Sequence, residues 1–253
     1  MKTITIIGYG KMAQAIAKGL NNKFKLEIIG RDEKKILDFI RSNSLLNTSY
    51  IITKDIINIE SKIVVLALKP YALEAFKYEG CAHIFYSLLA GVEIKKLKLF
   101  AKASHFCRVM PNVASFVNKG TNLIYPSNEE INEFTNSIFG EIGSIFFLDK
   151  ESYINSAGAI SGSGPAYLGL IAEALIDAGV REGLNLELSK QLVKNLFIGF
   201  SALLDSKEAL EIRLDTTSPN GTTTEGIDVF ERKATRGIIR EAVHAATLKA
   251  NNI

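Results

Sequence analysis

Two glycines near the start of the chain have the spacing of a dinucleotide-binding turn. The segment Gly8–Ala13 reads G-x-G-x-x-A and directly follows an apolar run, Thr3–Ile7. In this setting the first glycine allows a tight turn, the second lets the backbone approach a pyrophosphate, and the small last residue lets a helix pack closely on a strand. A glycine turn without a ligand is the alternative, but the position between an expected strand and an expected helix favours a nucleotide site.

The end of the second expected strand, Leu26–Ile29, bears on the choice between NAD and NADP. Gly30 stands where an NAD site usually has an acidic residue for the ribose 2′-hydroxyl, and Arg31 follows it. A guanidinium can donate several hydrogen bonds to a 2′-phosphate. Asp32 is the competing residue, because its carboxylate could accept from a 2′-hydroxyl. We therefore expect NADPH as the cofactor, with NADH as the alternative.

A third expected strand, Ile63–Leu68, runs directly into Lys69 and Pro70. Strands of such sheets end at the crevice where ligands bind, and a proline holds the residue before it in an extended backbone. Lys69 is thus a candidate for contact with an anionic ligand. An ordinary solvent-exposed lysine is the alternative interpretation.

The segment Ser218–Thr223 has the composition of a turn that leads into a helix. A helix start presents unpaired backbone N–H groups and the positive end of the helix dipole, which suits a carboxylate without an arginine. The alternative is a structural helix cap, with serine or threonine as the N-cap residue.

The elements that must position these segments alternate between strands and helices over the first half of the chain. Apolar runs expected as strands are Thr3–Ile7, Leu26–Ile29, Ile63–Leu68, Ile84–Leu88, Phe106–Met110, Thr121–Tyr125 and Ser144–Leu148. Segments with helical spacing are Lys11–Leu20, Glu33–Ile40 and Glu129–Phe139. This alternation predicts an α/β fold with a Rossmann-type parallel sheet and helices on both faces.

Near Asp149 the pattern becomes helical, so we expect an α/β domain over 1–150 and an all-helical domain over 151–253. The helix expected from Pro165 is apolar around most of its circumference, with Glu173 and Asp177 as its polar stripe. A helical domain of roughly 100 residues has little interior in which to bury such a helix. We therefore expect this helix at a subunit interface.

Composition excludes several classes of function. The 253 residues carry a formal net charge of +3 at pH 7, which does not suit a nucleic-acid surface. Two cysteines, Cys81 and Cys107, lie in apolar runs without a CxxC partner, so we expect buried free thiols and no metal site. We expect neither a signal peptide nor a membrane-spanning stretch, and hence a cytoplasmic protein.

Several motifs together resemble the pyrroline-5-carboxylate reductase family, almost from end to end. They are Gly8–Met12, Ala67–Pro70, Ala90–Val92, Arg108–Asn112, Ser161–Tyr167 and Ser218–Gly226. The resemblance implies NAD(P)H-dependent reduction of the cyclic imine 1-pyrroline-5-carboxylate to L-proline, the last step of proline biosynthesis. It also implies a helical domain that interleaves with its partner in a homodimer, and dimers of this family often assemble into decamers. The chain departs from the family at Asn220, where glycine is usual, and near Lys54, where asparagine is common.

The resemblance, together with Arg31, also implies the site residues. The cofactor is expected against Gly8, Tyr9, Gly10, Lys11, Met12, Arg31, Ala67, Leu68, Lys69, Pro70, Ala90 and Gly91. The small-molecule substrate is expected at Ser218, Gly221, Thr222 and Thr223, with Thr223 as the catalytic residue beside the ring nitrogen. An imine can arrive already protonated, so the enzyme mainly needs orientation and proximity. The histidines, His83, His105 and His244, lie outside these motifs.

Two other functions are alternatives to the one that this resemblance implies. The β-hydroxyacid dehydrogenases resemble the chain around Gly158 and Gly162–Gly164, but they need a catalytic lysine where Leu168 stands, and alcohol oxidation needs such a base. A nucleotide-binding redox sensor is the second alternative. The block Ser218–Thr223 argues against it, because a sensor needs no carboxylate site.

Overall fold

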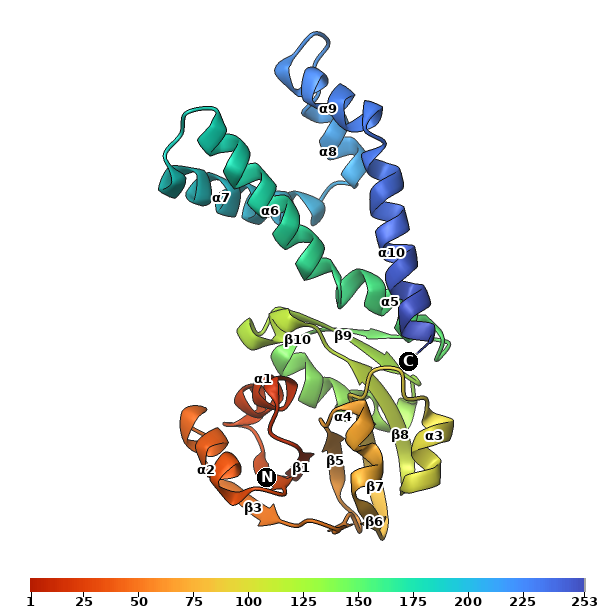
Figure 1. Ribbon diagram of the computed structural model, residues 1–253. Coiled ribbons are helices and arrows are strands. Elements are labelled where there is room, and N and C mark those ends of the chain that lie inside the picture. The colour runs from red at the N-terminus through yellow and green to blue at the C-terminus, as the bar shows by residue number, and fades with distance from the viewer. Residues whose placement is uncertain (253) are drawn as a thin grey trace. The chain divides into compact units, whose positions relative to one another are not determined.

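The computed structural model describes residues 1–252, which form two compact units. The first unit comprises Met1–Ser163 together with the last residues from Ala246 onward, and the second comprises Gly164–Ala245. Figure 1 shows strands in the first unit and only helices in the second. Strand β10 ends at Phe147, close to the predicted change of pattern at Asp149, whereas the first compact unit continues to Ser163. The domain boundary after residue 150 stays a prediction.

An eight-stranded sheet forms the centre of the first unit, in the order β10-β9-β8-β7-β5-β1-β2-β3. The strands are β1 Thr3–Ile7, β2 Lys25–Gly30, β3 Thr48–Ile52, β5 Ile63–Leu66, β7 Cys81–Ser87, β8 Lys102–Met110, β9 Gly120–Tyr125 and β10 Gly143–Phe147. All neighbours pair in parallel except β8 and β9. A second, two-stranded sheet pairs β4 Ile56–Asn58 with β6 Lys77–Glu79. The predicted fold class is therefore confirmed.

The helices of the first unit are α1 Lys11–Leu20, α2 Glu33–Ser42, α3 Ile94–Phe100, α4 Glu129–Phe139 and α5 Tyr153–Ser161, with short 3-10 helices η1 Pro70–Ala75, η2 Val113–Val117 and η3 Gly140–Ile142. Helices α1, α2 and α4 begin at the residues where the sequence predicts a helix. The link from β5 to β7 contains no α-helix and consists of η1 and β6. The residues of this link therefore reach the sheet from a short, irregular segment.

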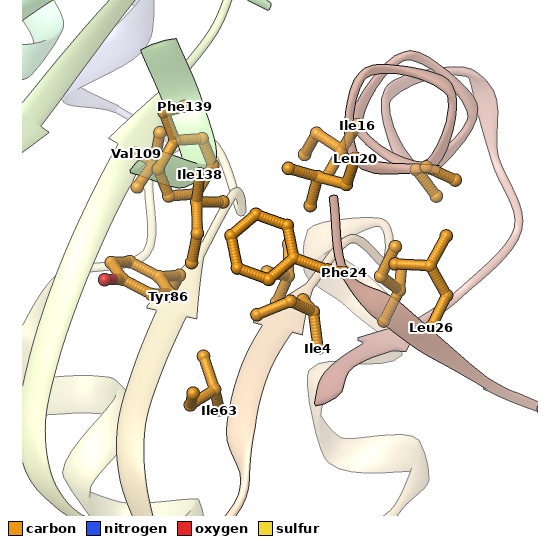
Figure 2. Close-up of a cluster of buried hydrophobic side chains, with 14 of the residues drawn as sticks. Ile4, Ile16, Leu20, Phe24, Leu26, Ile63, Tyr86, Val109, Ile138 and Phe139 are labelled. Atoms are coloured by element: carbon orange, nitrogen blue, oxygen red, sulfur yellow. The ribbon is translucent and has the colours of Figure 1, made fainter. Parts of the chain in front are cut away.

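Buried apolar clusters lie on both faces of the sheet, as its uniformly apolar central strands require. Figure 2 shows one of them, in which side chains of α1, β1 and β7 surround the ring of Phe24. Within it the Tyr86 and Phe139 rings pack edge to face with centroids 5.1 Å apart. The Tyr86 hydroxyl shares a hydrogen bond of 2.8 Å with Thr135 Oγ1, and burial raises the pKa of the phenol. The sheet thus presents its strand ends from a rigid, self-contained core.

The second unit buries very little of its apolar surface. Its helices are α6 Gly164–Arg181, α7 Leu186–Leu204, α8 Ala209–Asp215, α9 Thr222–Arg232 and the first part of α10 Thr235–Asn251. Ser189, Val193 and Ile212 are its only buried residues in the described chain. Large apolar side chains are instead exposed on α6 and α7: Leu168, Leu170, Ile171, Leu175, Val180, Leu188, Leu192, Leu196, Ile198, Phe200, Leu203 and Leu204. This pattern agrees with the expected subunit interface.

One expectation from the sequence was wrong, and a second is not settled by the structure. Cys107 is buried, and burial raises the pKa of its thiol to about 12, but Cys81 is exposed at the beginning of β7. The described chain also contains one helical stretch, Tyr153–Arg181, that is long and apolar enough by length and composition to cross a membrane.

Candidate active site

A cavity of about 710 Å³ lies in the first unit, at the carboxyl ends of strands β1, β2 and β5. Its walls are Gly8, Tyr9, Gly10, Lys11, Met12, Gly30, Arg31, Ala67, Leu68, Lys69, Pro70, Tyr71, Ala72, Phe76, Leu88 and Ala90. The structure thus brings together all but one of the residues that the sequence predicts around the cofactor. Gly91 is the exception, and it lines a smaller cavity of about 100 Å³ that shares Ala90 with the larger one.

The turn after β1 has the geometry that its glycines imply. Gly8 has a φ of +112°, and a Cβ atom there would lie 2.8 Å from the Ala67 carbonyl oxygen, so a larger residue would be both strained and crowded. Gly10 is the N-cap residue of α1, and no side chain among the described residues caps this helix. The first-turn amides of α1 are therefore available to an anion at the cavity wall. These features fit the pyrophosphate of a dinucleotide.

Arg31 and Asp32, the two residues that could contact the ribose, directly follow β2 and have different contacts. Asp32 is the N-cap residue of α2, and its carboxylate accepts a hydrogen bond of 3.1 Å from the Lys35 amide. Its other carboxylate oxygen lies 3.6 Å from Lys35 Nζ. Asp32 is thus engaged by its own helix. Arg31 is instead exposed and lines the cavity.

Arg31 rests on the short segment that links β5 to β7. Its Nη2 donates a hydrogen bond to the Ala75 carbonyl oxygen, and its guanidinium carbon lies 4.4 Å from the centre of the Phe76 ring. Phe76 is itself buried, in the apolar cluster on the face of the sheet opposite the cluster that contains Phe24. The sequence did not predict a role for Phe76, because the pattern of the segment between β5 and β7 does not indicate where the side chains of that segment lie.

Two further predicted positions have clear local causes. Gly30 must be small because a Cβ atom there would lie 2.4 Å from Cε1 of Tyr9, whose ring covers the strand end. Lys69 has the extended backbone expected before a proline, with φ −82° and ψ 148°, and Pro70 begins η1. The backbone at Lys69 therefore carries the chain from the end of β5 along the cavity wall.

The smaller cavity is lined by Arg108, which forms a part-buried ion pair that the sequence did not predict. Arg108 at the end of β8 is 3% exposed, and its Nη1 lies 3.2 Å from Glu151 Oε1. The same carboxylate oxygen accepts a hydrogen bond of 2.7 Å from the Ile94 amide at the start of α3. Glu151 thus ties the segment after Gly91 to the end of β8. A charged residue within the apolar run of β8 was the available signal.

In the second unit, Ser218–Thr223 forms the predicted turn into a helix. Gly221 is the N-cap residue of α9, so the alternative of a serine or threonine N-cap is not what the structure shows. The Ser218 carbonyl oxygen accepts from the Gly221 amide at 3.0 Å and from Thr224 Oγ1 at 2.6 Å. Asn220 adopts a left-handed backbone, with φ of +59°, which asparagine tolerates in place of the family's usual glycine.

The first turn of α9 is left open by this arrangement. In the described residues no side chain caps the helix, and the amide of Gly221 is already used within the turn. The free amides therefore begin at Thr222 and Thr223. Thr223 is half-buried, and its hydroxyl makes no hydrogen bond within residues 1–252. The turn thus presents two amides and a hydroxyl at the positive end of a helix dipole.

Comparison with known proteins gives a consistent picture over the whole chain. Residues 151–253 match the family model for pyrroline-5-carboxylate reductase dimerisation, and residues 3–84 match a model described as NADP oxidoreductase, coenzyme F420-dependent. A pyrroline-5-carboxylate reductase of Helicobacter pylori (strain J99) is 38% identical, over 98% of this chain and 99% of its own.

Solved structures are similar over nearly the same extent. The Streptococcus pyogenes 1-pyrroline-5-carboxylate reductase is 24% identical, covers 99% of this chain and 98% of its own, and has the same fold with a TM-score of 0.85. The Plasmodium falciparum pyrroline carboxylate reductase, solved with NADP bound, is 28% identical over 99% of this chain and 98% of its own, with a TM-score of 0.77.

Proposed function

The chain belongs to the pyrroline-5-carboxylate reductase family, and we propose on that basis that it reduces 1-pyrroline-5-carboxylate to L-proline with NADPH. The observation that carries the proposal is the 38% identity to a reductase of this name over 98% of the chain. It is supported by the dinucleotide-type cavity in the first unit and by the open helix start at Thr222 in the second.

The cofactor site that we propose is the cavity at the ends of β1, β2 and β5, with Ala90 and Gly91 at its edge. Gly8 and Gly10 let the backbone approach the pyrophosphate, which accepts from the free amides of α1. Arg31 meets the 2′-phosphate, and the Asp32 carboxylate, which could otherwise accept from a ribose 2′-hydroxyl, caps α2. Bound NADPH supplies the hydride that the C=N carbon of the substrate ring accepts.

For the substrate, we assign the ring carboxylate to the open first turn of α9. The amides of Thr222 and Thr223 donate to it, while Ser218 and Gly221 hold the turn closed behind them. Thr223 Oγ1 has no partner within the described chain, so it is free to hydrogen-bond at the ring nitrogen. Orientation by this hydroxyl suffices because a protonated imine is already electrophilic.

The working form that we propose is a homodimer, formed through the exposed apolar faces of α6 and α7. The match of 151–253 to a dimerisation model covers the stretch Tyr153–Arg181, whose apolar composition a subunit interface explains. Assembly of dimers into a decamer and a location in the cytoplasm are the further parts of this proposal.

A steady-state assay tests the function directly. Purified protein should oxidise NADPH in the presence of pyrroline-5-carboxylate and form proline in equal amount, and NADH should support the reaction less well. A β-hydroxyacid such as 3-hydroxyisobutyrate with NADP⁺ is the control, and it should give no turnover because Leu168 occupies the position of the required lysine. Absence of proline formation at saturating NADPH would refute the proposal.

A further inference from the structure

Arg31, to which we assign the 2′-phosphate, is exposed and lines the cofactor cavity. An exposed arginine samples many rotamers, and binding a phosphate requires it to settle into one of them. A side chain that is already held in the bound position loses less entropy, and its affinity is correspondingly higher. The contacts that hold Arg31 at the cavity wall therefore matter for its affinity for a phosphate.

Two contacts hold the Arg31 guanidinium in this structure. One edge donates to the Ala75 carbonyl oxygen, and one face lies 4.4 Å from the centre of the Phe76 ring. Phe76 is 7% exposed, so its ring is fixed by the apolar cluster behind it while it also lines the cavity. A planar cation bound in this way keeps its remaining N–H donors for another ligand.

We propose that Phe76 is a positioning residue for recognition of the 2′-phosphate, acting through Arg31. The inference rests on the proposed cofactor role of Arg31 and deepens it. The short link through η1 is what makes the contact possible, because it ends at Ala75 and carries Phe76 to the same wall as the end of β2. The ring supplies a rigid, electron-rich face for the cation.

Binding of two small probes to the whole protein tests this without turnover. Adenosine 2′,5′-bisphosphate carries the 2′-phosphate, adenosine 5′-monophosphate lacks it, and calorimetric titration gives the ratio of their affinities. Arg31→Ala should lower that ratio about ten- to a hundredfold. Phe76→Leu should lower it about two- to fivefold, since a cation–π contact at an accessible site contributes on that scale.

Matched variants separate positioning from packing. Phe100→Leu removes an aromatic ring that packs against the same apolar cluster without touching Arg31, and it should leave the ratio unchanged. Phe76→Tyr retains the ring face and should restore the ratio. In an Arg31→Ala background, Phe76→Leu should have no further effect on the ratio. If Phe76→Leu does not fold, Phe76→Met answers the same question, because the flexible methionine side chain adapts better to an irregular gap.

The outcomes are distinct. An unchanged or increased ratio in Phe76→Leu, combined with a fall in Arg31→Ala, overturns the role of Phe76 and leaves the cofactor assignment intact. An unchanged ratio in Arg31→Ala overturns both. A fall in Phe76→Leu that persists in the Arg31→Ala background also overturns the inference, because Phe76 would then act without the arginine.

Discussion

The two compact units treat their apolar residues in opposite ways. In the first unit, isoleucine, leucine and phenylalanine side chains form large buried clusters on both faces of the sheet. The helices of the second unit also carry many large apolar side chains. Within the described chain, however, they bury only Ser189, Val193 and Ile212. The second unit therefore leaves its apolar faces uncovered in the single chain, and the proposed homodimer would cover them.

The substitution Ile171→Glu tests this contrast most severely. Ile171 is 41% exposed on α6 in the single chain, but we expect it to be buried in the assembly. An unpaired carboxylate buried there would be costly, so the variant should be inactive and either dissociated or insoluble. Light scattering gives the mass. The control is Leu99→Glu on α3, a residue that is 80% exposed in the first unit, and it should keep mass and activity. An active monomer of the unmutated protein contradicts the interface.

The core of the first unit should respond differently. Ile16 is fully buried between α1 and the sheet, so Ile16→Ala leaves a cavity that costs about 2–5 kcal/mol of stability. Denaturant unfolding measures the loss, and the mass of the folded assembly should stay unchanged. If Ile16→Ala instead changes the number of subunits, then packing in the first unit affects assembly, contrary to the prediction.

The sequence predicts the central strands well because each is buried on both faces and forms a continuous apolar run, as Ile63–Leu66 does. It does not predict β3, β4 and β6, which are short or lie at an edge. Thr48–Ile52 has exposed apolar residues and polar neighbours, so its pattern is not that of a buried strand. Only the pairing with β2 makes it a strand.

The same distinction applies to the candidate site. Gly8, Gly10 and Pro70 are predictable because their backbone requirements are local. Contacts between segments distant in the sequence are not, such as Tyr9 over Gly30 or Arg31 on Phe76. The hydrogen bond of the Thr224 hydroxyl is of the same kind, because its partner is a backbone oxygen six residues earlier.

The proposed catalytic residue, Thr223, lies in the second unit, and Thr223→Val tests its role. The change keeps the shape of the side chain and removes its hydroxyl, which should cost about 1–3 kcal/mol if the hydrogen bond to substrate is buried. That corresponds to a roughly ten- to hundredfold fall in kcat. NADPH affinity should persist, since its proposed site lies wholly in the first unit. Full turnover in this variant means that the hydroxyl has no catalytic role.

The smallest effect is expected from Thr224→Val, which addresses the shape of the turn instead of its chemistry. Thr224 Oγ1 donates a hydrogen bond of 2.6 Å to the Ser218 carbonyl oxygen, and this bond is exposed. Its loss should cost at most about 1 kcal/mol, because water replaces the donor. The turn then closes less firmly around the substrate carboxylate, so KM for pyrroline-5-carboxylate should rise a few-fold with kcat nearly unchanged. Thr216→Val is the control, since its hydroxyl donates a bond of the same length to Ile212 within α8 and should leave KM unaltered. A fall in kcat as large as that of Thr223→Val would show that Thr224, too, acts on the reacting ring.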